Sequence, residues 1–252
     1  KLSKKIVKLK KRHHDLLGDD TAFGIMPDWN PAEMIGVNPR PLAFSLYKEL
    51  ITDSVWSKNR KSLGFRDVTS NPLMTMFLGK PYIDMRVDFN SWVPSELKRS
   101  TAEKLVNYYI QKLKKNTNNH DKIEFNIILD SYNFNTEREL NDLKRNSFND
   151  NEISHIKTVL KKHTNYLFDN FSSTIKADDL MVRNLMRKYK RLKDKEQDSK
   201  ELLSQIIYNI KLLKTNGTPQ FCRSARYAFF AKNILNSLYD IEPEFADDIN
   251  KF

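Results

Sequence analysis

The chain has 252 residues, of which 39% are hydrophobic and 30% are charged, and its mass is 29.7 kDa. This composition excludes a disordered tail, and no apolar run approaches the ~18 residues that a membrane span needs. The single cysteine, Cys222, excludes an internal disulfide and a multi-cysteine zinc site. The start of the chain is basic and lacks the apolar segment of a secretory leader, so we expect a cytoplasmic protein. Because the chain begins with Lys, we also expect it to be a piece of a longer protein.

The net charge of +11 is concentrated at the start of the chain. Residues 1–12 hold seven Lys or Arg and no acidic residue, whereas both signs are mixed elsewhere. Leu2, Ile6 and Leu9 recur at helical spacing, which predicts an amphipathic helix that joins a preceding domain. An arm for phosphate backbones or membrane surfaces is the alternative.

Three helical regions are predicted from apolar periodicity. Pro41 opens a helix that runs to about Arg60, a second helix follows Ser95 and ends near Lys115, and the chain from Glu137 onward has helical patterns throughout.

Alternating apolar and polar residues predict strands near 73–78, 82–89 and 123–129, the first two joined by a turn at Gly79. The predicted fold class is therefore α+β, predominantly helical, with a small antiparallel sheet.

Common catalytic motifs are absent from the sequence. It contains no Gly-rich dinucleotide fingerprint, no P-loop, no G-x-S-x-G and no H-E-x-x-H. The histidines His155 and His163 are eight residues apart, too far for a joint metal clamp on one helix, and we predict no metal site. The chain shows no complete catalytic apparatus of its own.

The strongest polar pattern lies on the strand predicted near 82–89. Asp84, Arg86 and Asp88 alternate on one face, and Asn90 and Ser91 lie at its end. Arg offers a planar fork to a carboxylate or phosphate, and Asp can bind an ammonium group. The pattern predicts a substrate-binding face, or else a solvated face with cross-strand charge pairs.

A second candidate follows Gly217. Thr218 is a natural N-cap and Pro219 a first-turn residue, and Arg223 and Arg226 follow on the new helix. A helix N-terminus with arginines is typical of an anion site, although an ordinary capped helix has the same pattern.

Two further segments are punctuated by prolines. Arg40 stands between Pro39 and Pro41, which limits its backbone freedom. Asp28, Asn30 and Glu33 in the PDWNPAE segment are second-tier candidates, for substrate binding or for docking another domain.

Four blocks of sequence are long and unusual: FGIMPDWNPAEMIGV (23–37), NPRPLAFSLYKELITDSVWS (38–57), PYIDMRVDFNSWVPSEL (81–97) and GTPQFCRSARYAFFA (217–231). Together they resemble the central region of the phosphoenolpyruvate synthase/pyruvate phosphate dikinase family. They are most similar to the branch that includes the bacterial L-glutamine kinases of capsular phosphoramidate biosynthesis.

The resemblance implies a three-part kinase. An ATP-grasp domain binds ATP and Mg²⁺, a mobile domain carries a phosphorylatable histidine, and the central region holds the acceptor. ATP phosphorylates the histidine, giving AMP and phosphate, and the phosphohistidine then phosphorylates the acceptor. In the glutamine kinases the acceptor is the side-chain amide of L-glutamine.

The chain departs from the full pattern because it has no ATP-grasp domain and no histidine in a Gly/Thr/Ser-rich setting. We therefore expect residues 1–22 to be a basic helical connector from an ATP-grasp domain. We expect residues 23–252 to be the acceptor-substrate domain, with an α+β part over 23–135 and a helical part over 136–252. Such a fragment binds no cofactor and is inactive with ATP alone. Its partners are the small acceptor and the two outer domains, without nucleic acid or membrane.

Under this hypothesis, Arg86 or Arg40 binds the substrate carboxylate and Asp84 or Asp88 its ammonium group. Thr218 and Arg226 receive the phosphoryl group. Three alternatives stay open: the same architecture with pyruvate or another small acid as acceptor, a module that docks nucleic acid, and a non-catalytic spacer.

Overall fold

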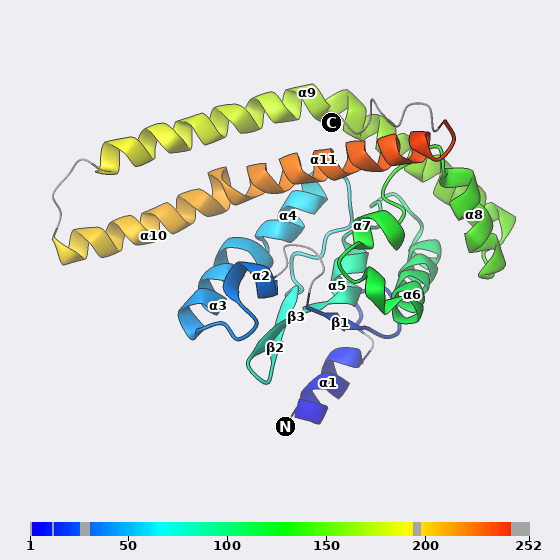
Figure 1. Ribbon diagram of the computed structural model, residues 1–252, viewed down its shortest axis with the longest axis horizontal. Coiled ribbons are helices and arrows are strands. Elements are labelled where there is room, and N and C mark those ends of the chain that lie inside the picture. Colours follow the sequence, from blue (N-terminus) through cyan, green and yellow to red (C-terminus); the bar gives the residue numbers. More distant parts are fainter. Residues whose placement is uncertain (1, 12, 26–30, 194–197, 243–252) are drawn as a thin grey trace.

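A computed structural model describes residues 2–11, 13–25, 31–193 and 198–242 of the chain (Figure 1). Its elements in chain order are α1 (Leu2–Lys10), β1 (Phe23–Gly24), α2 (Pro31–Ile35), α3 (Pro41–Tyr47), the π-helix η1 (Lys48–Thr52), α4 (Val55–Ser62), β2 (Met74–Phe77), β3 (Lys80–Asp84), α5 (Met85–Asn90), α6 (Arg99–Lys115), the 3₁₀ turn η2 (Thr117–Asn119), α7 (Ile123–Asn126), α8 (Thr136–Arg145), α9 (Asp150–Lys193), α10 (Ser199–Asn216) and α11 (Thr218–Tyr239). The fold is α+β and predominantly helical with a small antiparallel sheet, as predicted.

The long helices lie along one side of an α+β body. Figure 1 shows α9 running beside the nearly collinear α10 and α11, while the sheet and the shorter helices lie below them. α11 packs on α4 and on α9, and the far half of α9 pairs with α10 in an arm that projects from the body.

The projecting arm carries apolar side chains that are exposed. Leu203, Ile206 and Met186 are 59%, 54% and 52% exposed. The apolar stripe of α10 therefore contributes little to the core. Among the described residues, no helix combines the length and the apolar character that a membrane span requires.

The sheet of the described chain has the strand order β1-β3-β2, antiparallel throughout. β2 and β3 form a hairpin in which Phe77 pairs with Lys80 across Leu78 and Gly79. Both turn residues have positive φ, 49° and 81°, as the two-residue turns that match strand twist require. The two-residue strand β1 was not predicted, because it is too short to give a pattern.

The strand predicted near 82–89 is wrong beyond Asp84. There β3 ends and α5 begins, because the Asp84 side chain accepts hydrogen bonds from the backbone N–H groups of Arg86 and Val87 and so caps a helix. Asp84, Arg86 and Asp88 therefore do not share one face of a strand. All the residues of α5 are buried, so the alternating pattern does not divide them into an inner and an outer face.

The strand predicted near 123–129 is also wrong. Ile123 accepts hydrogen bonds from the N–H groups of Ile127 and Ile128, which closes one helical turn, α7. Ile127, Ile128 and Leu129 are all buried in succession, which a strand with one solvent face would not allow.

The helix predicted from Pro41 to about Arg60 is interrupted. It passes into the π-helix η1 and then breaks at Ser54, whose φ is 73°, before α4 begins. Leu42 of the predicted apolar stripe is 70% exposed, whereas Tyr47 and Val55 are buried.

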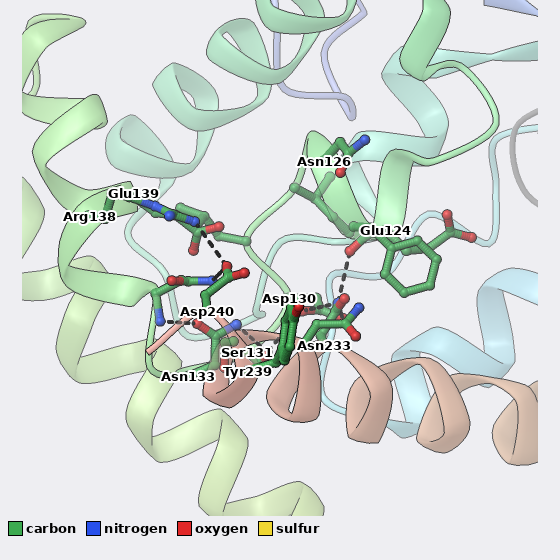
Figure 2. A pocket seen from close by; sticks show the side chains of 16 residues that line it. Glu124, Asn126, Asp130, Ser131, Asn133, Arg138, Glu139, Asn233, Tyr239 and Asp240 are labelled. Carbon is green, nitrogen blue, oxygen red and sulfur yellow. Dashed lines mark hydrogen bonds and ion pairs between the residues drawn. The ribbon is translucent and has the colours of Figure 1, made fainter. Parts of the chain in front are cut away.

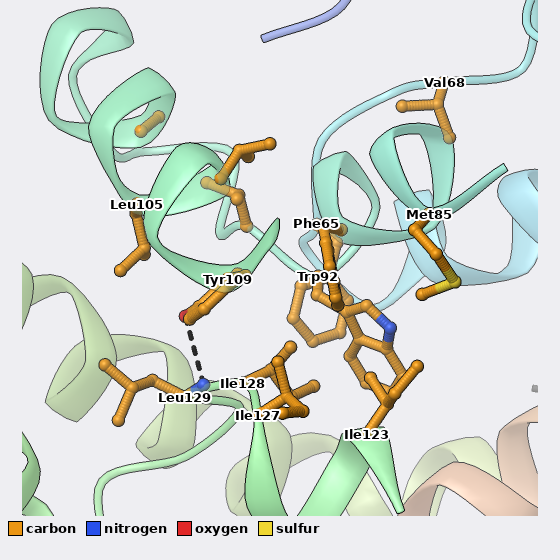
Figure 3. Close-up of a cluster of buried hydrophobic side chains, with 14 of the residues drawn as sticks. Phe65, Val68, Met85, Trp92, Leu105, Tyr109, Ile123, Ile127, Ile128 and Leu129 are labelled. Atoms are coloured by element: carbon orange, nitrogen blue, oxygen red, sulfur yellow. Dashed lines mark hydrogen bonds between the residues drawn. The ribbon is translucent and has the colours of Figure 1, made fainter. Parts of the chain in front are cut away.

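The hydrophobic core lies where α5, α6 and the 123–129 segment meet (Figure 3). Phe65 and Trp92 pack edge to face with ring centroids 5.8 Å apart. The Tyr109 hydroxyl, buried in this core, accepts a 3.0 Å hydrogen bond from the Leu129 N–H. This bond fixes the segment that leads into the polar pocket described below.

Candidate binding site

The predicted binding residues of α5 are instead parts of a buried framework. The Asp88 carboxylate lies 2.8 Å from Nη1 of Arg60, and the same nitrogen donates to the Ser91 hydroxyl. Arg60 is 5% exposed and its guanidinium lies 3.8 Å from the centroid of the Trp92 ring. These contacts cross-link α4 to α5 and leave Asp88 with no exposed surface.

Asp84 and Arg86 hold β3 and α5 to the start of the chain. The Thr21 hydroxyl donates to the Asp84 carboxylate at 2.6 Å, and burial raises the pKa of that carboxyl against the opposing effect of this hydrogen bond. Arg86 is 3% exposed and donates from Nη2 to the backbone carbonyl of Leu9, at the end of α1.

Asn90 completes this framework. Its side-chain amide accepts from the Leu17 N–H and donates to the Leu17 carbonyl, both at 2.8 Å. The strand face predicted at Asp84–Ser91 does not form, because these residues cap or belong to a buried helix. Their side chains bond to distant segments, while Nε and Nη1 of Arg86 are buried without a hydrogen-bond partner among the described residues.

A helix begins at Thr218 with Pro219 in its first turn, as predicted, but Thr218 is not its N-cap. The N-cap position is Gly217, no side chain caps the helix, and α10 leads directly into α11, with the Gly217 N–H bonded to the Leu213 carbonyl. Arg223 forms a bidentate pair with Asp178 instead of facing an open helix end.

The remaining predicted residues lie apart from one another. Arg40 is exposed at the N-cap of α3 and makes no side-chain cap. Glu33 is exposed on the one-turn helix α2. Asp28 and Asn30 lie outside the described residues.

Arg226 leads to the strongest candidate site. Its guanidinium lies 4.0 Å from the centroid of Trp92, on a ring that also contacts Arg60, and Nη1 is 3.5 Å from the Asp130 carboxylate. Asp130 in turn lines a pocket between α7, α8 and the second half of α11.

This pocket, which we call the acidic-amide pocket, has a volume of about 330 Å³. Figure 2 shows its two sides, with Arg138, Glu139 and Asp240 facing Asp130 and Asn233. Further polar side chains around it include Glu124, Asn126, Asn133, Asn135, Ser131 and Tyr239.

The inner wall is built around Asp130, which is 5% exposed. Its carboxylate accepts hydrogen bonds from Ser131 Oγ at 3.0 Å and from Asn233 Nδ2 at 3.1 Å, and Asn233 also donates to the Glu124 carbonyl. Burial raises the pKa of Asp130, and the charge of Arg226 opposes that rise.

The outer wall has exposed groups of both signs. Asn135 donates to the Asp240 carboxylate at 2.6 Å, and Arg138 lies 3.5 Å from the same oxygen with its side chain 70% exposed. This geometry leaves Arg138 able to turn toward an incoming anion, since an exposed ion pair contributes little stability.

Glu139 is the titratable group of the pocket closest to neutral pH. Burial raises its pKa to about 7; the Asp130 carboxylate adds to the rise, and Lys112 and Arg138 oppose it. Burial in turn lowers the pKa of Lys112, which donates to the Ile127 carbonyl. A cation bound beside Glu139 would favour its ionised form and so oppose this rise.

The pocket can hold a small molecule that carries an ammonium group, a carboxylate and an amide. Carboxylates suit the first and Arg138 the second. Nδ2 of Asn233 and of Asn135 already donate to other groups, so the third would meet their Oδ1 atoms as acceptors. Of the predicted site residues, Arg226 lies behind this pocket, and Asp130 separates it from the pocket interior. The run D-S-Y-N-F-N at 130–135, directly after the strand predicted at 123–129, is the polar signal in the sequence for this pocket.

One group among the described residues has metal-ligand spacing. His13, His14 and Asp15 place their ligand atoms within 4.8 Å of one another, and all three are exposed. His14 Nε2 is 3.0 Å from the Asp15 carboxylate, an ordinary surface pair, and we assign no metal to it.

Comparisons with known proteins find no matching family model, no similar curated protein and no similar solved structure.

Proposed function

We propose that this chain is the acceptor-substrate part of a cytoplasmic, ATP-dependent kinase that works through a phosphohistidine relay, with the side-chain amide of L-glutamine as acceptor. The overall reaction is ATP + L-glutamine + H₂O giving AMP, phosphate and L-glutamine phosphate. Two observations support the proposal: the resemblance of four sequence blocks to the phosphoenolpyruvate synthase family, and the acidic-amide pocket. The ATP and Mg²⁺ sites and the phosphohistidine belong to the outer domains of the same enzyme.

The observation that carries the choice of acceptor is the mixed chemistry of this pocket. Glu139 and the buried Asp130 suit an α-ammonium group, Arg138 suits an α-carboxylate, and Asn233 lies beside Asp130 on the wall opposite Arg138. Pyruvate, by contrast, has no cation to offset the four carboxyl residues that line the same pocket. These residues replace Arg40, Arg86, Asp84 and Asp88 in the roles that the sequence had suggested.

Phosphoryl transfer to an amide requires a pocket that binds and orients the substrate. An amide nitrogen is a weak nucleophile because its lone pair is delocalised, so the pocket must orient it toward the incoming phosphohistidine and exclude water.

The test is isothermal titration of the chain with L-glutamine, L-glutamate and pyruvate. We expect L-glutamine to bind best, Arg138→Ala to weaken binding at least tenfold, and Glu139→Gln to remove its pH dependence near 7. Arg145→Ala and Glu137→Gln are matched controls on the same helix, exposed and paired with Asp142 and Lys157. The chain alone should not consume ATP.

The alternatives give different results in the same experiment. Tighter binding of pyruvate than of L-glutamine would identify pyruvate as the acceptor. If no small molecule binds, the chain would be a non-catalytic spacer. Micromolar binding of nucleic acid with a steep dependence on salt would favour the docking module. Consumption of ATP by the chain alone would contradict the division of labour that we propose.

A further inference from the structure

The projecting arm has a surface to which the glutamine proposal gives no role. The arm consists of residues 179–190 of α9 and of the whole of α10, and none of these residues is buried. Figure 1 shows both stretches extending beyond the body of the molecule. The arm is tied to the body where α10 ends, since Lys214 forms an ion pair with Glu49 of η1.

One side of α9 carries an apolar stripe along the arm. Val182, Met186 and Tyr189 follow one another at spacings of four and three residues, which places them on the same side of the helix. Asp178, four residues before Val182, pairs with Arg223 of α11, so this side faces α11 and, further along the arm, α10. Because the three apolar residues remain partly exposed, α10 covers this stripe only in part.

α10 carries a second apolar stripe. Leu202, Leu203, Ile206 and Ile207 have helical spacing and share one side of the helix. Lys214, seven residues after Ile207, continues this side and reaches η1. Toward the tip of the arm the stripe extends beyond the body, and its four residues are exposed there.

The two stripes together exceed the apolar patches of ordinary monomers. With Met181, they hold eight residues that are each 37–59% exposed. An unfolded chain exposes about 1.45 Å² per dalton, which is roughly 170 Å² for an apolar residue of average size. The two stripes therefore leave on the order of 700 Å² uncovered, whereas the largest patch on a typical monomer has about 300–600 Å².

A second copy of the arm fits these stripes in size and in shape. Two copies would cover on the order of 1,400 Å², which lies within the range of about 1,200–2,000 Å² for specific protein interfaces. Two helical hairpins that pack by their apolar sides form a four-helix bundle, and a two-fold axis brings the same stripes together. Arg183 and Arg187 lie on the side of α9 away from Tyr189, so this pairing does not bring their charges together.

We infer that the arm is a dimerisation surface, on which the apolar stripes of α9 and α10 pack against the same stripes of a second copy of this chain. The hydrophobic effect drives this association, because each copy removes the exposed stripes of the other from water. The inference does not depend on the glutamine proposal, since the arm shares no residue with the acidic-amide pocket.

The test is sedimentation equilibrium of the chain at micromolar concentrations. We expect a reversible dimer with twice the 29.7 kDa mass of the chain. Met186→Glu and Ile206→Glu each place two like charges in the symmetric interface, and each should raise the dissociation constant at least tenfold.

Each helix of the arm offers a matched control. Leu180 lies two residues before Val182, and Tyr208 lies two residues after Ile206; both are exposed. Two residues turn a helix by about 200°, so both controls point away from the stripes. Leu180→Glu and Tyr208→Glu should leave the dissociation constant within twofold.

Hydrogen exchange of the unaltered chain guards against variants that fail to fold. Backbone amides of residues 180–190 and 200–210 should exchange more slowly as the chain concentration rises, while those of β3 should not change. A monomer at every concentration, a dimer protected elsewhere, or an equal effect of the control variants would overturn the inference. So would a monomer that binds vesicles of anionic lipid and loses this binding in Met186→Glu. L-glutamine binding should stay unchanged in the arm variants, so either proposal can fail while the other stands.

Discussion

Two polar clusters of this molecule have similar residues but opposite surroundings. The α5 cluster (Asp84–Ser91) is buried, and its side chains pair with Arg60, Thr21 and the backbone at Leu9 and Leu17. In the acidic-amide pocket, Arg138 is 70% exposed and Glu139 has its pKa raised to about 7. The difference between the clusters is access to solvent: Nε and Nη1 of Arg86 have no hydrogen-bond partner among the described residues but are shielded from solvent, whereas Arg138 reaches it.

Loss of Arg60 should have the largest effect on stability, because it removes the arginine that pairs with the fully buried Asp88 carboxylate. We expect Arg60→Met to lower the free energy of unfolding by about 3–5 kcal/mol, as measured by urea denaturation. Lys61→Ala, which breaks only the exposed pair with Asp67, should cost less than about 1 kcal/mol. Equal effects of the two substitutions would contradict the contrast between the clusters.

Glu139 should make the free energy of unfolding depend on pH. Its pKa of about 7 in the fold lies above the ordinary 4.5, so the unfolded chain loses this proton first as pH rises. Glu139 therefore lowers the free energy of unfolding progressively between pH 4.5 and 7, by up to about 3 kcal/mol. Relative to the unaltered chain, Glu139→Gln should gain stability over this window.

The comparison must be made between variants. Burial lowers the pKa of His163 to about 4, so stability gained from that residue rises with pH up to its ordinary 6.5 and masks the effect of Glu139. The difference between Glu139→Gln and the unaltered chain cancels His163. The difference in free energy of unfolding between Glu139→Gln and the unaltered chain should therefore change with pH. If it does not, or if Glu137→Gln gives the same difference, the pKa of Glu139 is not raised by burial.

Asp84 should have a smaller effect than Arg60 although it is as deeply buried. Asp84→Ala removes the N-cap of α5 and the acceptor of the Thr21 hydroxyl, and we expect a loss of about 2 kcal/mol in thermal or urea unfolding. Asp198→Ala removes the exposed capping box of α10 and should cost about 1 kcal/mol or less. A smaller loss of stability at Asp84 than at Asp198 would contradict the expectation that the buried cap contributes more than the exposed one.

Local patterns predicted what depends on neighbours in sequence. The β2–β3 hairpin, the helix that ends at Lys115 and the helical character after Glu137 follow from periodicity and turn residues, and the structure confirms them. The alternation of apolar and polar residues after Asp84 predicted a strand, but the structure has the helix α5 there. The conformation is decided by the Asp84 cap and by burial on every side of the helix.

The sites could not be predicted because their partners are distant. The Asp84 carboxylate meets Thr21 across 63 positions, and Asp130 meets Asn233 across 103. No window of sequence contains both members of such a pair. Arg226 was selected for its place near the N-terminus of α11, but it lies at the back of the pocket through its contact with Asp130.

Arg40 gives the smallest expected effect. Its two flanking prolines suggested a held side chain, yet it is exposed at the N-cap of α3 and makes no cap. Arg40→Ala should therefore change the free energy of unfolding by less than about 0.5 kcal/mol, and it should leave L-glutamine binding within twofold. Arg138→Ala is the informative counterpart, since Arg138 is also exposed but lines the acidic-amide pocket. If Arg40→Ala weakened L-glutamine binding as much as Arg138→Ala, both arginines would act through net charge alone. The acidic-amide pocket would then not be the binding site for L-glutamine.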